Sequence, residues 1–176
     1  MKRPLAVSST MLGSPMTTES LREAVTRGIT QMELLIPPHG ETCLTPVEFQ
    51  RIAAIGEDAG MRTWSVHAPF GGGVDLSAPD ELARREAVGQ VRRACEVAGM
   101  FAANCVVMHA GMTTGDEAEQ DLRRTQSLRS LNYLLECTRR HGLQLVVEYL
   151  PSNKPRLCNH SAEILEMLAL CDGTPG

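Results

Sequence analysis

The stretch Leu143-Gln-Leu-Val-Val-Glu-Tyr-Leu-Pro151 is an apolar run with one carboxylate, Glu148, near its end. Two earlier runs, Met61–His67 and Asn104–His109, each end in a histidine. All three are bounded by Gly or Pro, rich in large apolar residues and too short for a free-standing helix, which is typical of buried strands. Because a buried ionisable group is costly unless it is paired or bound, we predict that the three ends share one polar site.

Helix signals separate these runs from one another and from two further predicted strands at residues 4–9 and 29–36. Thr17 or Thr18 can cap the first helix, and Thr45-Pro-Val-Glu48 is a capping box with Pro at the first helical position. Apolar spacing that begins at Leu82 and at Leu122 predicts the inward faces of two later helices. The five helices are expected at residues 17–28, 45–60, 77–99, 116–140 and 161–171. Strands that alternate with such helices predict βαβ units and a parallel sheet.

Two α/β architectures are compatible with this pattern. A five-stranded doubly wound open sheet is a complete fold at 176 residues, whereas a (β/α)₈ barrel usually needs about 250 residues. Polar groups at the ends of all five strands favour the barrel, because an open sheet binds ligands only at a switch point between some strands. These groups are Ser9/Thr10, Glu33, His67, His109 and Glu148. We expect a parallel (β/α) barrel in which about five of eight units are present, as one domain over residues 1–176, with the open sheet as the alternative.

Side-chain alternation along each strand predicts which face of the sheet carries the site. Each polar end shares its face with the residue two positions earlier, and bulkier residues on the opposite face would meet the helices. The predicted site face carries Ser65 with His67, Val107 with His109, and Val146 with Glu148.

Composition narrows the range of partners. A net charge of -4 argues against a nucleic-acid partner, and no apolar run approaches the about 20 residues that a membrane helix needs. Arginine pairs at residues 84–85, 92–93, 123–124 and 139–140 alternate with acidic residues at helical spacing, which predicts solvated outer faces. Six cysteines without a Cys-x-x-Cys pair indicate reduced, mostly buried thiols in a cytoplasmic protein.

Four segments together resemble the xylose isomerase-like barrel superfamily, and the resemblance runs through essentially the whole chain. They are Val66-His-Ala-Pro-Phe-Gly71, Val74-Asp-Leu-Ser77, Val106-Val-Met-His-Ala-Gly111 and Val146-Val-Glu-Tyr-Leu-Pro151. This superfamily includes sugar phosphate isomerases and epimerases as well as abasic-site nucleases of the endonuclease IV type.

The resemblance implies roles for individual residues. Glu148 matches a metal ligand that in the epimerases also takes part in proton transfer, and His109 matches a metal ligand of the endonuclease branch. His67 matches another metal ligand of that branch, and in many sugar enzymes the residues that correspond to both histidines line the substrate pocket instead. Phe70, before three glycines, is expected either on a loop that covers substrate or in a wide turn. Glu33 could reach the pocket or remain an exposed strand-end carboxylate.

The superfamily completes its metal site with acidic and histidine ligands from strands six to eight, whereas the sequence reaches only a fifth helix. We therefore expect a fragment of a longer barrel. An unclosed barrel leaves the first and fifth strands unpaired on one side, so we expect a homo-oligomer.

These observations lead to one functional hypothesis and two alternatives. We expect a metal-dependent sugar or sugar-phosphate isomerase or epimerase that transfers a proton next to a carbonyl, with Mn, Mg or Zn as the divalent ion. The alternatives are a metal-dependent nuclease acting on abasic DNA and a non-catalytic barrel fragment that self-associates. Glu148 could also be a structural residue paired with an arginine, and His109 a hydrogen-bonded core histidine.

Overall fold

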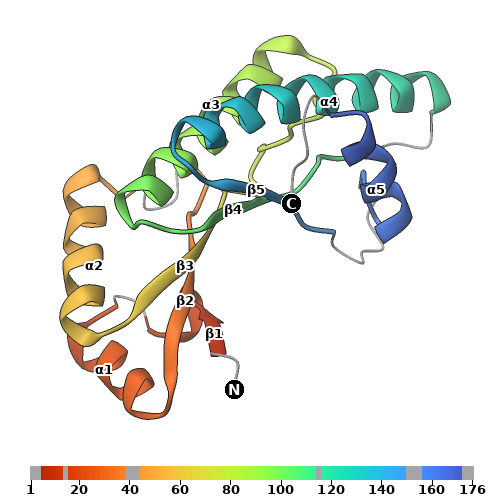
Figure 1. The fold of residues 1–176 in the computed structure, drawn as a ribbon. Helices are drawn as coiled ribbons and strands as arrows, with labels where there is room; N and C mark the ends of the chain where they lie inside the picture. Colours follow the sequence, from red (N-terminus) through yellow and green to blue (C-terminus); the bar gives the residue numbers. More distant parts are fainter. Residues whose placement is uncertain (1–4, 14–15, 39–43, 114–115, 150–155, 172–176) are drawn as a thin grey trace.

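The computed structural model describes residues 5–13, 16–38, 44–113, 116–149 and 156–171 (Figure 1). Strands and helices alternate along the chain, as the sequence predicts. The elements are β1 (Leu5–Ser8), the 3₁₀ turn η1 (Ser9–Met11), α1 (Thr18–Thr26), β2 (Ile29–Leu35), α2 (Pro46–Ala59), β3 (Arg62–His67), α3 (Glu81–Met100), β4 (Cys105–Met108), α4 (Glu117–Arg140), β5 (Gln144–Val147) and α5 (Ser161–Ala169).

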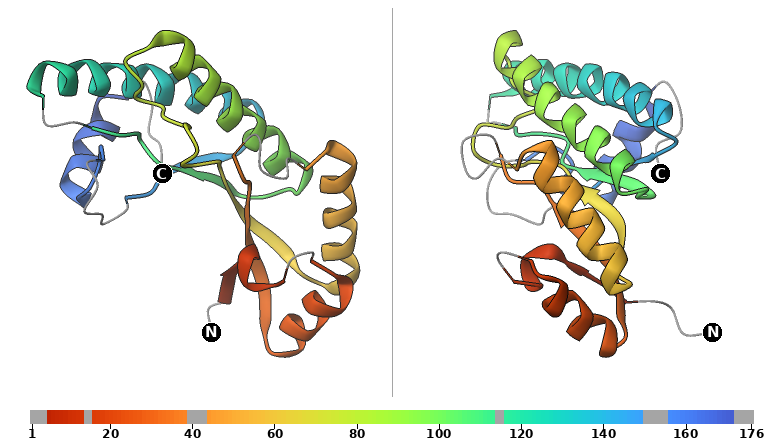
Figure 2. Two further views of the ribbon diagram at one scale, coloured as in Figure 1. Left: turned by 180° about the vertical axis from the view of Figure 1, so that it is seen from behind. Right: turned by 90° about the vertical axis from the view of Figure 1, so that its left-hand side faces the viewer.

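The strands of the described residues form one parallel sheet in the order β1-β2-β3-β4-β5. This order follows the chain without a reversal, so the described sheet lacks the switch point that defines a doubly wound fold. The sheet curves, and α1 to α4 lie on its convex side (Figures 1 and 2). Both features identify the arrangement as consecutive units of a β/α barrel and exclude the open-sheet alternative.

Local sequence signals set the helix starts. Thr17 accepts a hydrogen bond from the backbone N–H of Ser20 at 3.1 Å, and Thr45 and Glu48 form the predicted capping box before α2. Asp80 caps α3 through a 2.8 Å hydrogen bond from the backbone N–H of Ala83. Each cap satisfies N–H groups that have no partner within the helix.

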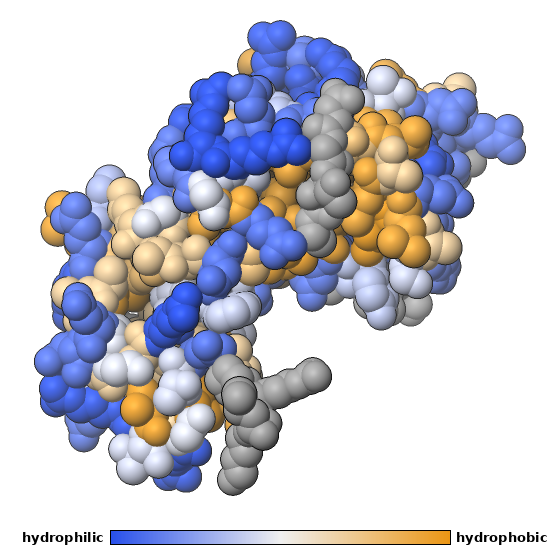
Figure 3. Space-filling view, in the orientation of Figure 1, coloured by the Kyte–Doolittle hydropathy of each residue, from blue (hydrophilic) through white to orange (hydrophobic). Residues whose placement is uncertain are grey.

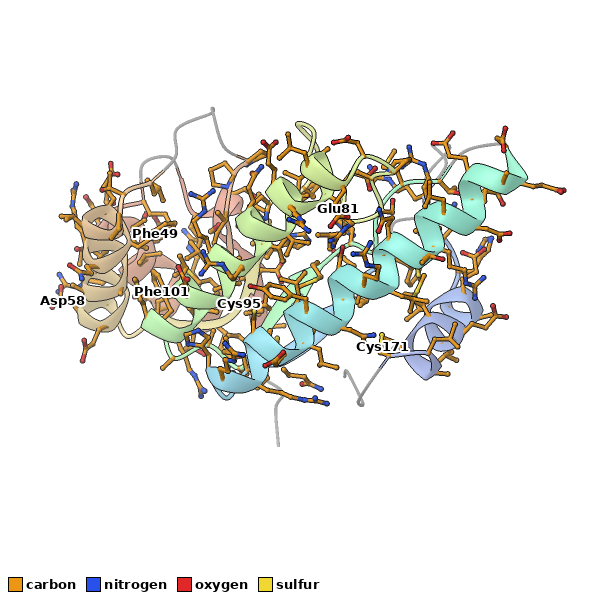
Figure 4. The ribbon with its side chains drawn as sticks, turned by 90° about the horizontal axis from the view of Figure 1, so that it is seen from above. Phe49, Asp58, Glu81, Cys95, Phe101 and Cys171 are labelled. Atoms are coloured by element: carbon orange, nitrogen blue, oxygen red, sulfur yellow. The ribbon has the colours of Figure 1, made fainter. Side chains whose placement is uncertain are left out.

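The main hydrophobic core lies between the sheet and the outer helices. Val66, Val106 and Leu145 are in register on neighbouring strands and at most 1% exposed. The convex side therefore carries the core, as predicted from side-chain alternation. The edge-to-face contact of the Phe49 and Phe101 rings, with centroids 6.4 Å apart, joins α2 to the end of α3 (Figure 4).

Two predicted core residues are exposed, Leu82 by 68% and Leu122 by 45%. Both lie in the first turns of long helices, and burial in α4 begins only at Gln126. The inward positions there belong instead to polar residues, among them Ser127 and Ser130, which hydrogen-bond to loop carbonyls. The apolar spacing predicted the wrong inward-facing residues because polar side chains occupy those positions.

The predicted exposure of the arginine pairs is wrong for one residue, whereas the predicted burial of the thiols is largely confirmed. Arg84 is 7% exposed, so the expectation that its pair lies in solvent is wrong for this residue. The cysteines within the described ranges form no disulfide, and all but Cys171 are buried, while Cys43 lies outside those ranges.

Among the described helices, none combines the length and apolar character needed to cross a membrane. Figure 3 shows apolar surface over α5, where Leu165 and Leu170 are exposed.

Candidate metal centre

Three side chains meet at the carboxyl ends of neighbouring strands. His67 is the last residue of β3, while His109 and Glu148 each follow the last residue of β4 and β5. The register pairs His67 with Val107, and Val107 with Val146, which places all three site residues on the same face of the sheet. One ligand atom from each residue lies within 4.8 Å of the other two. The structure thus brings together the three polar strand ends that the sequence singled out.

The carboxylate of Glu148 lies between the two imidazoles. Its Oε2 is 3.1 Å from Nε2 of His67 and 3.9 Å from Nε2 of His109. The two imidazole centroids are 5.1 Å apart. Two nitrogens and one oxygen therefore converge on a small volume.

The hydrogen bond at Nδ1 of each histidine determines whether its Nε2, which faces Glu148, carries a proton or a lone pair. Nδ1 of His67 lies 2.8 Å from the carbonyl oxygen of Ala68, and Nδ1 of His109 lies 3.0 Å from that of Glu148. A carbonyl only accepts, so both Nδ1 atoms carry the proton. In the neutral imidazoles both Nε2 atoms then direct lone pairs at the carboxylate. A cation or a proton is needed to make this arrangement favourable.

Burial reinforces this requirement at His109. Its Nε2 is buried and has no hydrogen-bond partner among the described residues. Burial is the main cause that lowers the pKa of His109, and the hydrogen bond to the Glu148 carbonyl opposes that shift only in part. The ring is thus held in the neutral form that a metal ion requires. Glu148 is 45% exposed at its side chain, so the site is open to solvent on the carboxylate side.

Phe70 forms one wall of the site. Its ring centroid lies 5.0 Å from that of His67 and 5.1 Å from that of His109. The chain then turns through three glycines with positive φ, closed by a bridge between Gly71 and Val74. The predicted substrate-contacting aromatic residue therefore lies directly beside both histidines.

Glu33 occupies a deeper layer. It is paired in register with Ser65, whose hydroxyl donates to Glu33 Oε2 at 2.8 Å. Ser65 lies two residues before His67, so Glu33 shares the concave face but not the cluster of His67, His109 and Glu148. Its carboxylate also contributes, after burial, to raising the pKa of Cys105.

The loops after β3 and β4 are fastened to each other by contacts that sequence reasoning missed. Asp75 Oδ1 accepts hydrogen bonds from the backbone N–H and the hydroxyl of Ser77 and from the backbone N–H of Met112, while Oδ2 accepts from Arg123. The Ser77 hydroxyl lies 2.8 Å from both N and O of Met112. The only signal in the sequence was the Val74–Ser77 motif, to which no role was assigned.

The comparisons with known proteins agree with this architecture. The family model described as the xylose isomerase-like TIM barrel matches residues 21–175. No curated protein sequence matches the chain.

Solved structures with the same fold include several sugar epimerases. A D-tagatose 3-epimerase-like protein has a TM-score of 0.80 at 20% identity, covering 97% of this chain and 62% of its own. D-psicose 3-epimerase in the presence of D-fructose has a TM-score of 0.75 at 14% identity, and the match covers 94% of this chain and 58% of that one. L-ribulose 3-epimerase has a TM-score of 0.73 at 15% identity, and the match covers 94% of this chain and 56% of that one.

These likenesses establish the fold, and the chain spans about 60% of the length of the solved barrels. The strand order, the site at the carboxyl ends of the strands and the match over residues 21–175 agree. The chain belongs to the xylose isomerase-like TIM barrel family.

Proposed function

We propose that this chain carries part of the active site of a metal-dependent sugar or sugar-phosphate isomerase or epimerase, which transfers a proton next to a carbonyl. The observation that carries the proposal is the convergence of two imidazole lone pairs and one carboxylate, on His67, His109 and Glu148. The sugar epimerases among the solved structures of the same fold support the substrate class.

The donor set fits a divalent metal ion. Imidazole and carboxylate suit Zn²⁺ and Mn²⁺, and a carboxylate also suits Mg²⁺. Both histidines donate their far N–H to a backbone carbonyl, the usual outer contact of a metal-ligating histidine. When bound, the ion would polarise the substrate oxygens and stabilise the negative charge that develops as the proton leaves. His109 and Glu148 would hold it, with His67 as a further ligand or a contact to the substrate hydroxyls.

Glu148 is the residue we assign to proton transfer. Its carboxylate is accessible to a ligand on the open side of the site, whereas both histidines are largely buried. A carboxylate next to the carbon that loses its proton can act as the base and return the proton afterwards. Its Oε2 lies 3.1 Å from Nε2 of His67, so a metal ion or a proton held between these two atoms would orient the carboxylate.

Two further residues would bind the sugar. The Phe70 ring, packed against both imidazoles, would exclude water from the reacting carbon. Glu33, one layer deeper on the concave face, would accept hydrogen bonds from sugar hydroxyls while it retains its bond from Ser65.

Metal titration tests the centre directly. We expect calorimetry to detect binding of Mn²⁺ or Zn²⁺ to the wild type, and the variants Glu148→Gln and His109→Gln to weaken it at least about tenfold. Glu136→Gln and His141→Gln, which change the same residue types at exposed positions of and after α4, serve as matched controls. Binding that survives in Glu148→Gln and His109→Gln would contradict the assigned metal site.

Proton transfer needs its own test. We expect the metal-loaded chain to exchange deuterium from solvent into D-fructose next to the carbonyl, detected by NMR, and Glu148→Gln to abolish the exchange. Metal binding without exchange of any ketose would leave the metal site standing and contradict the reaction.

A further inference from the structure

Arg156 carries a positive charge that no described residue matches. Its Nε is buried without a hydrogen-bond partner, and its guanidinium pairs with no carboxylate among the described residues. Other arginines on this side of the molecule are paired, Arg123 with Asp75 and Arg124 with Glu166. A guanidinium with a buried, unpartnered N–H is costly, which indicates that a ligand is its partner.

The backbone holds Arg156 beside the site. An antiparallel bridge joins Arg156 to Met112, and the N–H of Leu157 donates to the carbonyl of Gly111 at 3.2 Å. Both partners belong to the loop that begins at His109. Arg156 and Leu157 are therefore held against the loop that carries His109.

Arg156 and His109 line the same cavity, which has a volume of about 340 Å³. Phe70, Gly71, Gly73 and Met112 contribute to its walls. A β-carbon on Gly71 or Gly73 would have no atom within 4 Å. A side chain at either position would therefore have open space around its β-carbon.

The other charged group that lines this cavity is already neutralised. Asp75 accepts hydrogen bonds from Ser77 and Met112 and forms a 2.8 Å ion pair with Arg123. The unbalanced charge of the cavity is therefore positive and is that of Arg156.

We infer that Arg156 forms an anion subsite next to the His67–His109–Glu148 cluster, which takes the phosphate or carboxylate group of an acidic sugar. A planar guanidinium can donate two parallel hydrogen bonds to either group. Because the same cavity reaches His109, one molecule can place its anionic end at Arg156 and its carbonyl end at the cluster. This identification of the ligand as a sugar rests on the function proposed above, whereas the anion subsite does not.

The test uses the metal-free, ¹⁵N-labelled chain and NMR titration with three probes. D-fructose 6-phosphate supplies a phosphate, D-glucuronate supplies a carboxylate, and D-fructose is the neutral control. We expect the phosphate or the carboxylate probe to shift the Arg156 Nε–H resonance and the amide resonances of Gly71 and Gly73, and to bind at least about tenfold more tightly than D-fructose. The tighter of the two anionic probes identifies the group.

Two variants and one control assign the effect to the guanidinium. Arg156→Ala should abolish the preference for the anionic probe, and Arg156→Lys should keep only part of it because an ammonium cannot form the bidentate pair. Arg22→Ala, which removes an exposed arginine near the opposite end of the sheet, should leave it unchanged. Equal binding of all three probes, no binding of either anion, or an unchanged preference in Arg156→Ala would overturn the inference. No metal is present, so failure here is distinct from failure of the metal centre.

Discussion

A β-carbon on Gly111 would lie 2.5 Å from the hydroxyl oxygen of Ser77 and 2.9 Å from its backbone nitrogen. The loops that follow β3 and β4 therefore touch through their backbones at this point. Gly111 has φ +129°, a conformation that residues with side chains rarely adopt. His109 lies two residues earlier, so this contact restrains the loop that carries its imidazole.

The first prediction concerns this contact. Gly111→Ala should lower the free energy of unfolding by about 3 kcal/mol or more, because backbone strain and a steric clash with Ser77 act together. Gly28→Ala, also at positive φ but with no atom within 4 Å of the added carbon, should cost about 1 kcal/mol from strain alone. Urea denaturation of both variants checks this. Equal losses would show that the loops can move apart freely.

Arg84 and Arg85 offer a comparison between neighbours. Both pair with Glu81, but Arg84 is buried and also donates to the hydroxyl of Ser130 at 2.9 Å, whereas Arg85 is exposed. Arg84→Ala should destabilise the protein by about 2 kcal/mol, because it removes a buried, charged donor from a hydrogen-bonded network. Arg85→Ala should leave the unfolding midpoint close to that of the wild type. Similar midpoints for the two variants would argue against a structural role for Arg84.

The depressed pKa of His109 predicts how stability responds to acid. In the metal-free protein the folded state resists protonation of this ring, while the unfolded ring has a pKa of about 6.5. Below that pH the unfolded state binds more protons, so stability falls as the pH drops toward the folded pKa. His67, Glu148 and Arg156 face the ring and remain in His109→Gln, which should lose less stability between pH 7.5 and 5.5 than the wild type.

Urea unfolding at the two pH values makes this comparison. The matched variant His141→Gln, which replaces an exposed histidine after α4, should keep the wild-type response. An identical response in His109→Gln and the wild type would contradict the lowered pKa.

Buried thiols should resist alkylation. Burial raises the pKa of Cys95 to about 12 and that of Cys158 to about 11, so almost no reactive thiolate is present at pH 8. Peptide mapping after iodoacetamide treatment should find both unlabelled in the folded protein and labelled in guanidinium chloride, with the partly exposed Cys171 labelled earlier. Rapid labelling of Cys95 without denaturant would mean that α3 opens readily.

Self-association remains a prediction, and α5 offers a way to test it. Leu165 is 67% and Leu170 55% exposed there, and exposed apolar patches favour association. Sedimentation at micromolar concentration should find the wild type larger than a monomer, with Leu165→Glu and Leu170→Glu shifted toward the monomer. Leu82→Glu, at an equally exposed leucine of α3, should sediment like the wild type. A monomeric wild type would contradict the prediction.

Local patterns in the sequence were sufficient to predict the elements and the convergence of His67, His109 and Glu148. Capping residues such as Thr45 and Asp80 act within one helical turn, and alternation along a strand is visible without tertiary information. In a parallel sheet all carboxyl ends of the strands lie at the same edge. The sequence alone therefore predicts that His67, His109 and Glu148 lie close together, as the structure shows.

What the sequence did not predict depends on contacts between distant residues. Asp75 and Met112 are 37 positions apart, and Arg84 and Ser130 are 46 apart. Nothing in the local pattern distinguishes Arg84 from its exposed neighbour. Similarly, the place of Arg156 depends on a bridge to Met112 across the loops, which no helical or strand periodicity encodes.

The strand order has a consequence for how the protein can fold as it is synthesised. Each strand pairs with the one that precedes it in the chain, so every new β/α unit finds its docking surface already made, and loop-closure costs stay small. Growth from the amino terminus is then a series of local additions. The candidate metal centre is different, because Glu148 lies 81 residues after His67. On a ribosome-bound chain most of the sheet would therefore form before His67, His109 and Glu148 could come together, so the cluster would be complete only after the fifth strand had docked.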